Sequence, residues 1–297
     1  MDKFVAMNTF VRIVEKGSLT AAAGALETSL PSVVRTLAAL ERDLGVRLLN
    51  RTTRRLHLTD DGARYLDRCR TILSAVQDAE AVLTSRRTDP HGRLAVTASV
   101  LFGRRYIAPI VSDFLRRYPH VSADLLFVDR IVNLVEEGMD VAVRIGHLAD
   151  STLIAVPVGK LRRGVFASPE YLKRHGTPRT LADLRAHSCV RHTGLTLRDW
   201  HFRVGRRIVT IPIKAAVSCN DIDSSLQACL SGVGLGMFLS YQTAPYREAK
   251  KLKYVLEEFE TELVPVQVVY PQTRLVSSKV RAFVDECVSR LRQVPFD

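Results

Sequence analysis

A cluster of arginines marks one short segment of the chain, LGVRLLNRTTRRLHLTDDG at residues 44–62. Its members are Arg47, Arg51, Arg54 and Arg55, with no acidic residue among them. A guanidinium group donates several hydrogen bonds in a planar fork that matches phosphate oxygens, so the chemistry expected here is phosphate binding. Extended runs at 47–50 and 56–59 flank the TTRR turn and predict a β-wing that brings the arginines to a nucleic-acid backbone and minor groove.

Three short helices before the wing would position it. Apolar residues recur at helical spacing over residues 4–14, and Ser18 or Thr20 can cap a second, alanine-rich helix. Ser29 is a candidate N-cap of a third helix, with Pro31 in its first turn, where a missing N–H costs little. The inward-facing positions of the third helix are expected to be Val33, Leu37 and Leu40. Two helices with a tight turn between them predict a helix-turn-helix; the alternative is any small three-helix bundle.

The composition of the chain bounds its class and its partners. A length of 297 residues suits two domains or one large one, and 46% hydrophobic with 25% charged residues is ordinary for a soluble globular protein. A net charge of +12 and a pI near 9.8 favour a polyanionic partner, nucleic acid first, over a merely basic surface. We find no apolar signal region and no uncharged stretch long enough to span a bilayer, so we expect a cytoplasmic protein without a membrane partner.

The cysteines are scattered and form no CxxC pair, which argues against a disulfide framework or a zinc site. They are Cys69, Cys189, Cys219, Cys229 and Cys287. Isolated cysteines usually fill core positions, and redox sensing by two of Cys189, Cys219 and Cys229 is the alternative. We expect no metal and no cofactor.

A long helix is predicted from Asp60 to about Arg87, a stretch without proline whose only glycine is Gly62. Its apolar residues step by four and by three, the spacing of a coiled-coil seam. They are Tyr65, Cys69, Ile72, Val76, Ala79 and Leu83. We expect this linker helix to pair two subunits; packing against its own domain is the alternative. The sequence TDPHG at 88–92 would end the helix and form a hinge.

Beyond the hinge, predicted strands and helices alternate. Strands are expected at 93–99, 122–128 and 140–146, with helices at 103–118 and 132–138 between them. Such alternation predicts parallel strands joined by helices, an α/β domain. Further strand candidates are 153–159, 162–168, 187–192, 206–218, 234–240 and 263–270, and 279–291 is a closing amphipathic helix.

The segment GSLTAAAGALETSLPSVVRTLAALERDLGVRLLNRTTRRLHLTDDG resembles the N-terminal signature of LysR-type transcriptional regulators over nearly its full length. Weaker similarity continues through DVAVRIG, ASPEYLKRHGTP and SGVGLGMF, so the resemblance covers essentially the whole chain. It implies an N-terminal all-α winged helix-turn-helix and a long linker helix. It also implies a C-terminal effector domain of two α/β subdomains that resemble periplasmic binding proteins.

The same resemblance implies domain limits and partners. Residues 1–59 would bind DNA, 60–90 would form the linker helix and hinge, and 91–297 the effector domain. Subdomain one would consist of about 91–162 and 267–297, and subdomain two of about 163–266. The implied partners are double-stranded promoter DNA, a small organic effector, further copies of the chain in a dimer or tetramer, and RNA polymerase as a candidate. The implied function is effector-modulated transcription regulation.

The start of the third helix and the wing are the expected DNA-binding sites. The residues implied are Ser29, Leu30, Pro31, Ser32, Val34 and Arg35 in the helix and Arg51, Arg54 and Arg55 in the wing. The family often has glutamine in place of Leu30 and serine in place of Val34, so thymine-methyl contacts are favoured over polar readout there. Arg35 can reach a guanine edge or a phosphate, and Arg54 matches the wing position that reaches the groove; two solvated arginines are the alternative.

Ser99 ends the first strand of the α/β domain, just before a helix that begins near Phe102. An anion at Ser99 would meet free backbone N–H groups and the helix dipole; a plain N-cap is the alternative. By resemblance, the effector lies between the subdomains. The residues implied for it are Ser99, Val100, Phe102, Phe127, Ile145, Phe166, His192 and Asn220. Such a cleft suits a small organic molecule, for example a carboxylate, although His192 and Trp200 would fit a core equally well.

An α/β enzyme is the main alternative function. The run GVGLG at 232–236 follows a predicted helix and leads into a strand, the reverse of a dinucleotide-binding loop, so we interpret it as a helix C-terminal turn. No Walker motif, HExxH or GxSxG occurs, and no nucleophile, base and orienting group stand at a suitable spacing. We therefore predict that the chain is not an enzyme. An architectural DNA-binding protein without an effector is the other alternative, and it would leave the α/β domain without a role.

Overall fold

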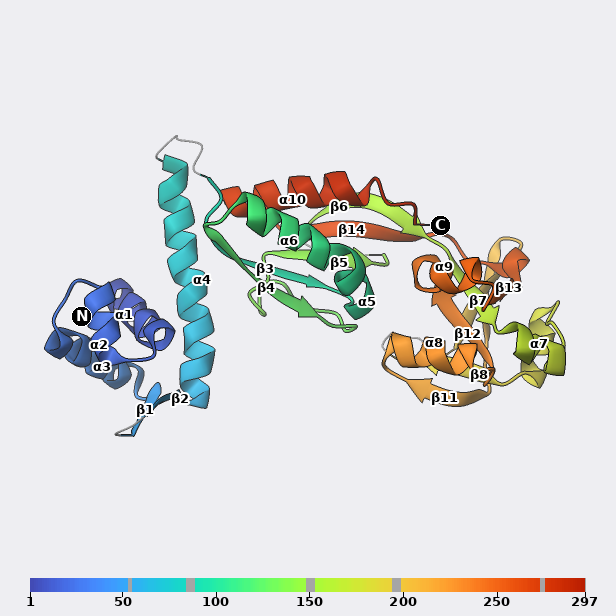
Figure 1. The fold of residues 1–297 in the computed structure, drawn as a ribbon, viewed down its shortest axis with the longest axis horizontal. Helices are drawn as coiled ribbons and strands as arrows, with labels where there is room; N and C mark the ends of the chain where they lie inside the picture. Colours follow the sequence, from blue (N-terminus) through green and yellow to red (C-terminus); the bar gives the residue numbers. More distant parts are fainter. Residues whose placement is uncertain (53–54, 84–88, 148–152, 194–198, 273–275, 297) are drawn as a thin grey trace. The chain divides into compact units, whose positions relative to one another are not determined.

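The computed structural model describes residues 1–52, 55–83, 89–147, 153–193, 199–272 and 276–296 (Figure 1). The chain divides into two compact units. One unit is Met1–Arg93 with the short segment Leu275–Ser278, and the other is Leu94–Arg274 with Lys279–Asp297. The linker helix thus groups with the N-terminal helices, and the α/β region forms a unit of its own.

The N-terminal unit contains the predicted helices and the wing. In chain order it consists of α1 (Lys3–Lys16), α2 (Leu19–Ala25), α3 (Leu30–Leu44), β1 (Leu49–Thr52), β2 (Arg55–Leu58) and α4 (Asp60–Leu83). The Ser18 hydroxyl accepts a hydrogen bond from the Ala21 N–H, and Ser29 does the same for Ser32, which confirms Ser29 and selects Ser18 over Thr20. Gly17 and Gly45 end α1 and α3 in the left-handed conformation that glycine adopts most easily.

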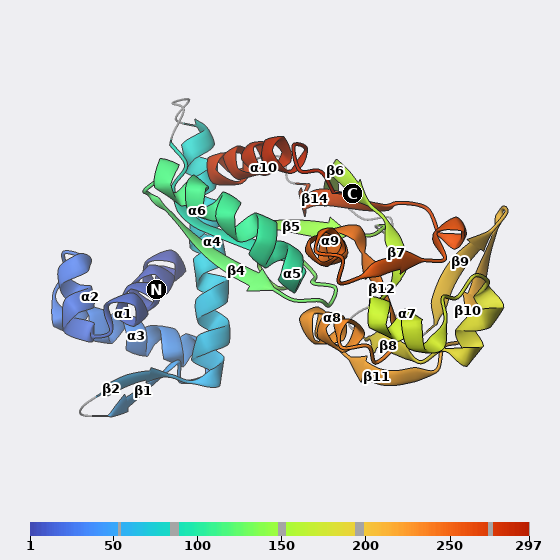
Figure 2. The ribbon, with the colours of Figure 1, turned by 45° about the vertical axis from the view of Figure 1, so that its right-hand side comes forward.

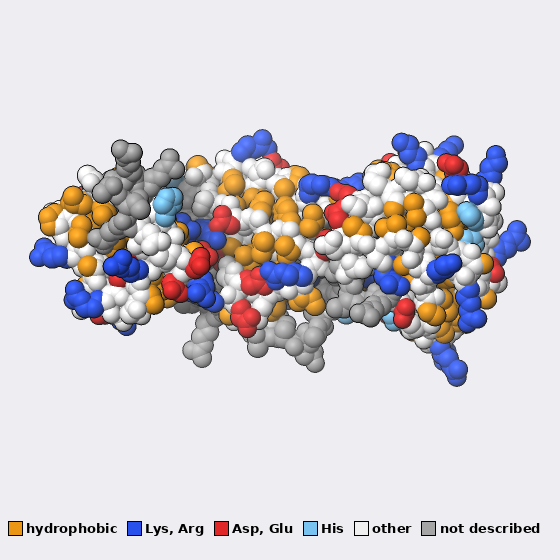
Figure 3. Space-filling model, turned by 90° about the horizontal axis from the view of Figure 1, so that it is seen from below, with side chains coloured by type: hydrophobic (Ala, Val, Ile, Leu, Met, Phe, Trp, Pro, Cys, Tyr) orange, Lys and Arg blue, Asp and Glu red, His pale blue; other side chains and the backbone are white. Residues whose placement is uncertain are grey.

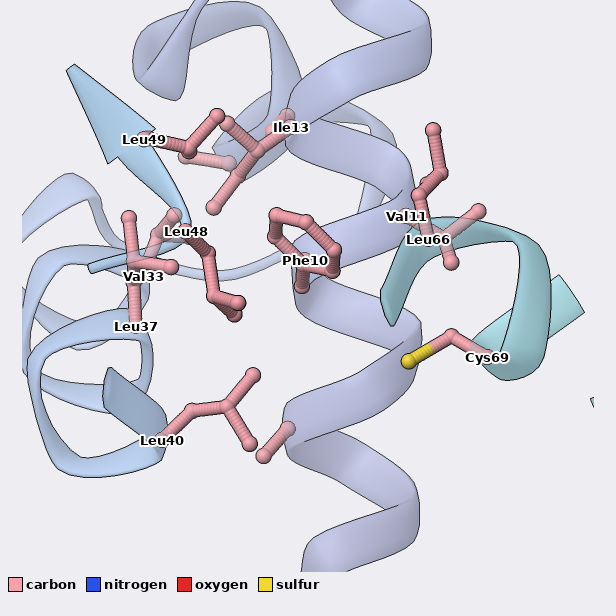
Figure 4. Close-up of a cluster of buried hydrophobic side chains, with 13 residues drawn as sticks. Phe10, Val11, Ile13, Val33, Leu37, Leu40, Leu48, Leu49, Leu66 and Cys69 are labelled. Atoms are coloured by element: carbon pink, nitrogen blue, oxygen red, sulfur yellow. The ribbon is translucent and has the colours of Figure 1, made fainter. Parts of the chain in front are cut away.

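The core of this unit lies between α1, α3, the wing and the start of α4 (Figure 4). Phe10 and Ile13 of α1 face the three predicted positions of α3, and all of them are fully buried. The other buried members that the figure labels are Val11, Leu48, Leu49, Leu66 and Cys69. Burying a large apolar side chain contributes about 1.5–3 kcal/mol, so this cluster holds the wing and the linker helix to the helix-turn-helix.

The predicted seam of the linker helix is only partly free. Cys69 is fully buried in the N-terminal core, and Tyr65 packs against Phe10 with 5.9 Å between ring centroids. For these two residues the interpretation as a dimer seam is wrong, because the same apolar spacing also serves packing within one domain. Ile72 is 43% exposed and remains available to a partner. Residues 84–88, at the predicted helix end and hinge, lie outside the described residues.

The second unit contains two mixed five-stranded sheets. The first has the order β4 (Val121–Phe127), β3 (Gly92–Ala98), β5 (Val141–Ile145), β14 (Val264–Pro271), β6 (Leu153–Leu161). The helical segments α5 (Val100–Phe102), η1 (Gly103–Ile107) and α6 (Ala108–Arg117) follow β3, and α10 (Ser278–Leu291) closes the chain. α6 and α10 lie side by side (Figures 1 and 2), joined by an Arg290–Asp113 ion pair of 2.5 Å and by Phe114 against Phe283.

The second sheet has the order β11 (Ala215–Cys219), β8 (Cys189–His192), β12 (Leu235–Leu239), β7 (Arg163–Ala167), β13 (Lys253–Val255). Around it are α7 (Pro169–His175), η2 (Leu181–Ala186), α8 (Ile222–Leu230), α9 (Ser240–Glu248) and η3 (Glu257–Phe259). The chain crosses from the first sheet to the second at Arg162 and returns before Val264, slightly earlier than the 267 implied by the resemblance. The GVGLG turn follows α8 with Gly232 in the left-handed conformation, as interpreted from the sequence.

Three features differ from the sequence predictions. The helix predicted over 132–138 is absent, and residues 134–138 form turns, because the Glu137 carboxylate accepts the Asn133 N–H and pairs with Arg130. The strands are parallel within β3–β5 and within β11–β8–β12, but β14 and β7 run antiparallel to their neighbours. The single strand predicted over 206–218 is two strands, of which β10 (Arg207–Ile211) forms a hairpin with the unpredicted β9 (Trp200–Val204) (Figure 2).

Candidate DNA-binding surface and effector cleft

The first turns of α3 present an exposed, partly apolar surface. Leu30 is 41% exposed, and Pro31 and Arg35 are exposed as well, whereas Ser32 and Val34 are half-buried. Arg35 forms no ion pair with any residue of the described ranges. An exposed apolar group beside an unpaired guanidinium can contact a thymine methyl group and a guanine edge or phosphate.

Two sets of hydrogen bonds hold the wing in place. The Glu41 carboxylate of α3 accepts the N–H groups of Leu48 at 2.8 Å and Leu49 at 3.2 Å. Where β2 leads into α4, the Thr59 hydroxyl donates to the Arg47 carbonyl at 2.7 Å and accepts the Gly62 N–H at 2.9 Å, which caps α4. The wing is therefore tied to both the helix before it and the helix after it.

The wing strands differ slightly from the predicted runs, since β1 and β2 pair antiparallel with Arg51 opposite Leu56 and Thr52 opposite Arg55. This register places the backbone of Arg51 and Arg55 on opposite strands near the turn. Their side chains lie outside the described part of the structure, and so does Arg54 entirely.

A cleft of about 470 Å³ lies between the two sheets of the second unit. From the first sheet it is lined by residues that follow β3 and β4 and by the end of β5. From the second sheet it is lined by the start of β7, the ends of β8 and β12, the start of β9, and α9. Ends of strands from two sheets that meet around one opening are a common place for a small-molecule site.

The structure places Ser99, Ile145 and His192 on the cleft wall. The remaining implied residues lie elsewhere. Phe102 is fully buried against Tyr106, Tyr241 and Phe296, and Phe166 is a core residue that stacks on Tyr254. Phe127 covers Gly103, where an added Cβ would lie 2.4 Å from its ring, and Asn220 is exposed before α8. Val100 is absent from the wall as well.

Several cleft residues were not among those implied for the effector site by the resemblance. They are Asp129, Arg163, Trp200, Met237 and Tyr241. Arg163 directly follows the predicted crossing between the subdomains, and Trp200 is the only tryptophan of the chain. These two features of the sequence could have identified both residues as candidates for the cleft. The others come to the cleft through contacts between distant segments, which the sequence does not reveal.

The polar groups of the cleft are incompletely satisfied. The Ser99 hydroxyl and the Nδ1 atoms of His192 and His201 are buried without a hydrogen-bond partner in the described ranges. Burial lowers the pKa of His192, so its imidazole is neutral at pH 7. Burial raises the pKa of Tyr241 to about 12, so its hydroxyl stays protonated. Unsatisfied buried polar groups are costly, and a bound ligand could satisfy them.

Two polar contacts are among those that join the two sides of the cleft within the described residues. Arg104 of η1 pairs with Asp223 of α8, and the Arg105 guanidinium donates to the Tyr241 carbonyl at 2.8 Å. The Arg104–Asp223 pair is largely exposed, so it contributes little to stability. Contacts of this kind can form and break as the subdomains move around a ligand.

Burial disfavours a redox role for two of the three candidate cysteines. Cys189 and Cys229 are buried, and burial raises the pKa of each thiol to about 12. Because the thiolate is the reactive form, these two thiols are protected from oxidation near neutral pH. The redox alternative is therefore not supported for this pair.

Positively and negatively charged side chains are mixed on the face of the molecule shown in Figure 3. On the face shown in Figure 3, Lys and Arg side chains are interspersed with Asp and Glu instead of forming one basic patch. None of the helices in the described ranges is long and apolar enough to cross a membrane.

Family models match both parts of the chain. Residues 4–63 match the model described as bacterial regulatory helix-turn-helix protein, lysR family. Residues 87–292 match the model described as LysR substrate binding domain. Together the two matches cover the chain except for residues 1–3, 64–86 and 293–297.

Named relatives resemble the chain over almost its full length. It is 38% identical to an HTH-type transcriptional repressor of Pseudomonas aeruginosa over 96% of this chain and 91% of that protein. It is 34% identical to the HTH-type transcriptional regulator CrgA of Neisseria meningitidis over 96% of both chains. The solved structure of CrgA, described as a LysR-type transcriptional regulator, matches with a TM-score of 0.62 and 33% identity over 97% of this chain and 98% of that one.

Proposed function

Because the chain belongs to the LysR family of bacterial transcriptional regulators, we propose that α3 and the wing bind promoter DNA and that a small organic effector in the cleft modulates this binding. The observation that carries the DNA-binding part is the surface of α3, where Leu30 and the unpaired Arg35 are exposed next to a wing fixed by Glu41 and Thr59. The proposed DNA contacts are Ser29, Leu30, Pro31, Ser32, Val34, Arg35, Arg51, Arg54 and Arg55.

Substitution of the proposed contacts tests this part. We expect Arg35→Ala and Arg54→Ala each to weaken binding to the chain's own upstream DNA and to reduce the slope of log affinity against log salt by about 1. Arg12→Ala is the matched control, because Arg12 lies on α1 and is already paired with Glu15 at 3.1 Å. Fluorescence anisotropy at several salt concentrations measures both quantities. Equal affinity and equal slope for all three variants and the wild type would contradict the assignment.

The effector part rests on the cleft and on the two contacts across it. A ligand that fills the cleft differently in open and closed arrangements shifts the population between them, and hence the spacing of DNA-binding units in an assembly. The shift requires different affinities for the two arrangements. The effector we propose is a small organic molecule, for example a carboxylate, and the cleft residues implied by the resemblance that it would contact are Ser99, Ile145 and His192. The role is that of a regulator and not of an enzyme.

Assembly through the linker helix is the third part of the proposal. The exposed Ile72 and the half-buried Val76 of α4 are the described seam residues that a second copy can cover in a dimer or a tetramer. Light scattering at micromolar concentration tests this, and a monomer would contradict it. RNA polymerase is a further proposed partner, because a promoter-bound regulator shares its DNA with the polymerase.

A further inference from the structure

The guanidinium of Arg163 lines the cleft without a partner among the described residues. Arg163 is the first residue of β7, immediately after the crossing, and it makes no side-chain hydrogen bond or ion pair with any described residue. The other arginines of the cleft are engaged. Arg130 pairs with both carboxylate oxygens of Glu137 at 2.7 and 2.6 Å, and Arg191 donates to the Ile213 carbonyl at 3.4 Å. Arg144 donates to the Val132 carbonyl.

An unpaired cation in this position is unfavourable in the empty protein. Arg163 is partly buried, and burial lowers its pKa, which shows that its charge has lost water. Its side-chain nitrogen atoms are not among the polar atoms that are fully buried without a hydrogen-bond partner, so a ligand in the cleft can reach them. A carboxylate would restore the lost interaction through two parallel hydrogen bonds to the planar guanidinium.

The opposite side of the cleft disfavours an anion. The first backbone N–H after Ser99 is that of Val100, and it donates a hydrogen bond to the Asp129 carboxylate at 3.0 Å. Asp129 therefore already occupies the place in which an anion was expected beside Ser99, and its charge repels a second one. Only one of its oxygens is used by a described residue, and the buried hydroxyl of Ser99 and the Nδ1 of His192 also lack partners. This side of the cleft suits a hydrogen-bond donor.

The volume and the walls limit the remainder of the ligand. A volume of about 470 Å³ falls in the range of small-molecule sites. Apolar wall residues such as Val143, Ile145, Trp200 and Met237 lie among the polar groups and can pack against a hydrocarbon body.

We propose that the effector is a small organic acid that also carries a hydroxyl or amino group, with its carboxylate on Arg163 and its donor group on Asp129. This inference rests on the proposed function and assigns the ligand class and its orientation. The anion lies at the crossing between the subdomains and not at Ser99.

Matched compounds test the ligand class. The probes are phenyllactate, phenylalanine, hydrocinnamate and phenethylamine, with leucic acid, leucine, isocaproate and isoamylamine as an aliphatic set. Calorimetry and thermal shift of the full chain should show binding by hydroxy or amino acids, weaker binding by the plain acids and none by the amines. Asp129→Asn should remove the advantage of the substituted acids over the plain ones. Binding by the amines, or no binding by any probe at millimolar concentration, would overturn the proposal.

The neighbouring arginines provide a matched pair of variants. Arg163→Gln should reduce affinity for the best acid at least about 30-fold, with the melting temperature of the ligand-free protein unchanged or raised. Arg163→Lys should retain part of the affinity, because it keeps the charge without the fork. Arg162→Gln should do the reverse, since Arg162 pairs with the half-buried Glu260 at 2.9 Å and does not line the cleft. It should lower the melting temperature and leave affinity intact.

The reverse pattern, with Arg163→Gln unstable and still binding the acids, would show that Arg163 is structural and would refute the assignment. Titration of the wild type with its upstream DNA, without probe, separates this result from the proposed function. Loss of selective DNA binding counts against the regulator, whereas loss of acid binding alone counts against the ligand class.

Discussion

Gly62 sits where the linker helix meets the wing, and its replacement by alanine should loosen that junction. A Cβ added at Gly62 would lie 2.0 Å from the carbonyl oxygen of Leu48 and 3.1 Å from Cδ2 of Leu58. The nearest atom belongs to the backbone, so no side-chain rotation can relieve the clash. Either β1 or the start of α4 must move.

The magnitude follows from three contributions. Forced overpacking costs about 1–3 kcal/mol. Displacing the Leu48 carbonyl weakens its hydrogen bond with the Thr59 N–H, 3.0 Å long, which costs about 1 kcal/mol more. The higher helix propensity of alanine returns about 1 kcal/mol. We therefore expect a net loss of about 1–3 kcal/mol, or a fall of at least about 4 °C in the melting temperature of the N-terminal unit.

Gly24 of α2 is the matched control, because nothing lies within 4 Å of a Cβ added there. Gly24→Ala should be neutral or stabilise by about 0.5 kcal/mol. The only tryptophan, Trp200, belongs to the other unit, so hydrogen exchange of peptides from α1 to α4 in the full chain is the suitable assay. Equal or slower exchange in Gly62→Ala than in the wild type would refute the packing argument.

Three further predictions concern the anchor of the wing and the buried titratable groups. Glu41→Ala should destabilise the N-terminal unit by about 2 kcal/mol, because two backbone N–H groups lose their acceptor. Glu15→Ala, which removes an exposed ion pair, should destabilise it by well under about 1 kcal/mol. Hydrogen exchange measures both changes. Burial lowers the pKa of His192, so on acidification the histidine of the unfolded chain is protonated before that of the folded chain. The stability of the folded protein should therefore fall as the pH drops below about 6.5. His192→Gln should make thermal unfolding less sensitive to pH in that range. Cys189 and Cys229, whose pKa burial raises to about 12, should resist alkylation in the native state at neutral pH and react on unfolding, as followed by mass spectrometry; rapid native labelling would contradict their burial.

Local signals in the sequence were reliable guides to the N-terminal unit. Ser18 and Ser29 cap their helices through hydrogen bonds to residues three positions ahead, so the sequence alone contains both partners. The inward positions of α3 follow from helical periodicity in the same way. Even here, periodicity did not reveal that Cys69 faces α1 and not a second subunit, because both surfaces require the same apolar spacing.

Specific side-chain contacts explain the remaining differences. Residues 132–138 have a helical pattern, but the Arg130–Glu137 pair and the Asn133 turn override it. Similarly, the sequence predicts an anion site beside Ser99, but the Val100 N–H there already donates to Asp129, which comes from the segment after β4. A sequence shows which residues can bind an anion. Whether a neighbouring chain segment already fills the place is decided by the fold.

The most direct test of the central claim is a fluorescence-anisotropy titration of the full chain against fragments of its own upstream DNA. It should be performed at two salt concentrations and in excess nonspecific competitor. The proposed function predicts binding to one fragment that survives the competitor and weakens as salt rises. Equal binding to all fragments and to the competitor would contradict the assignment of the chain as a site-specific regulator.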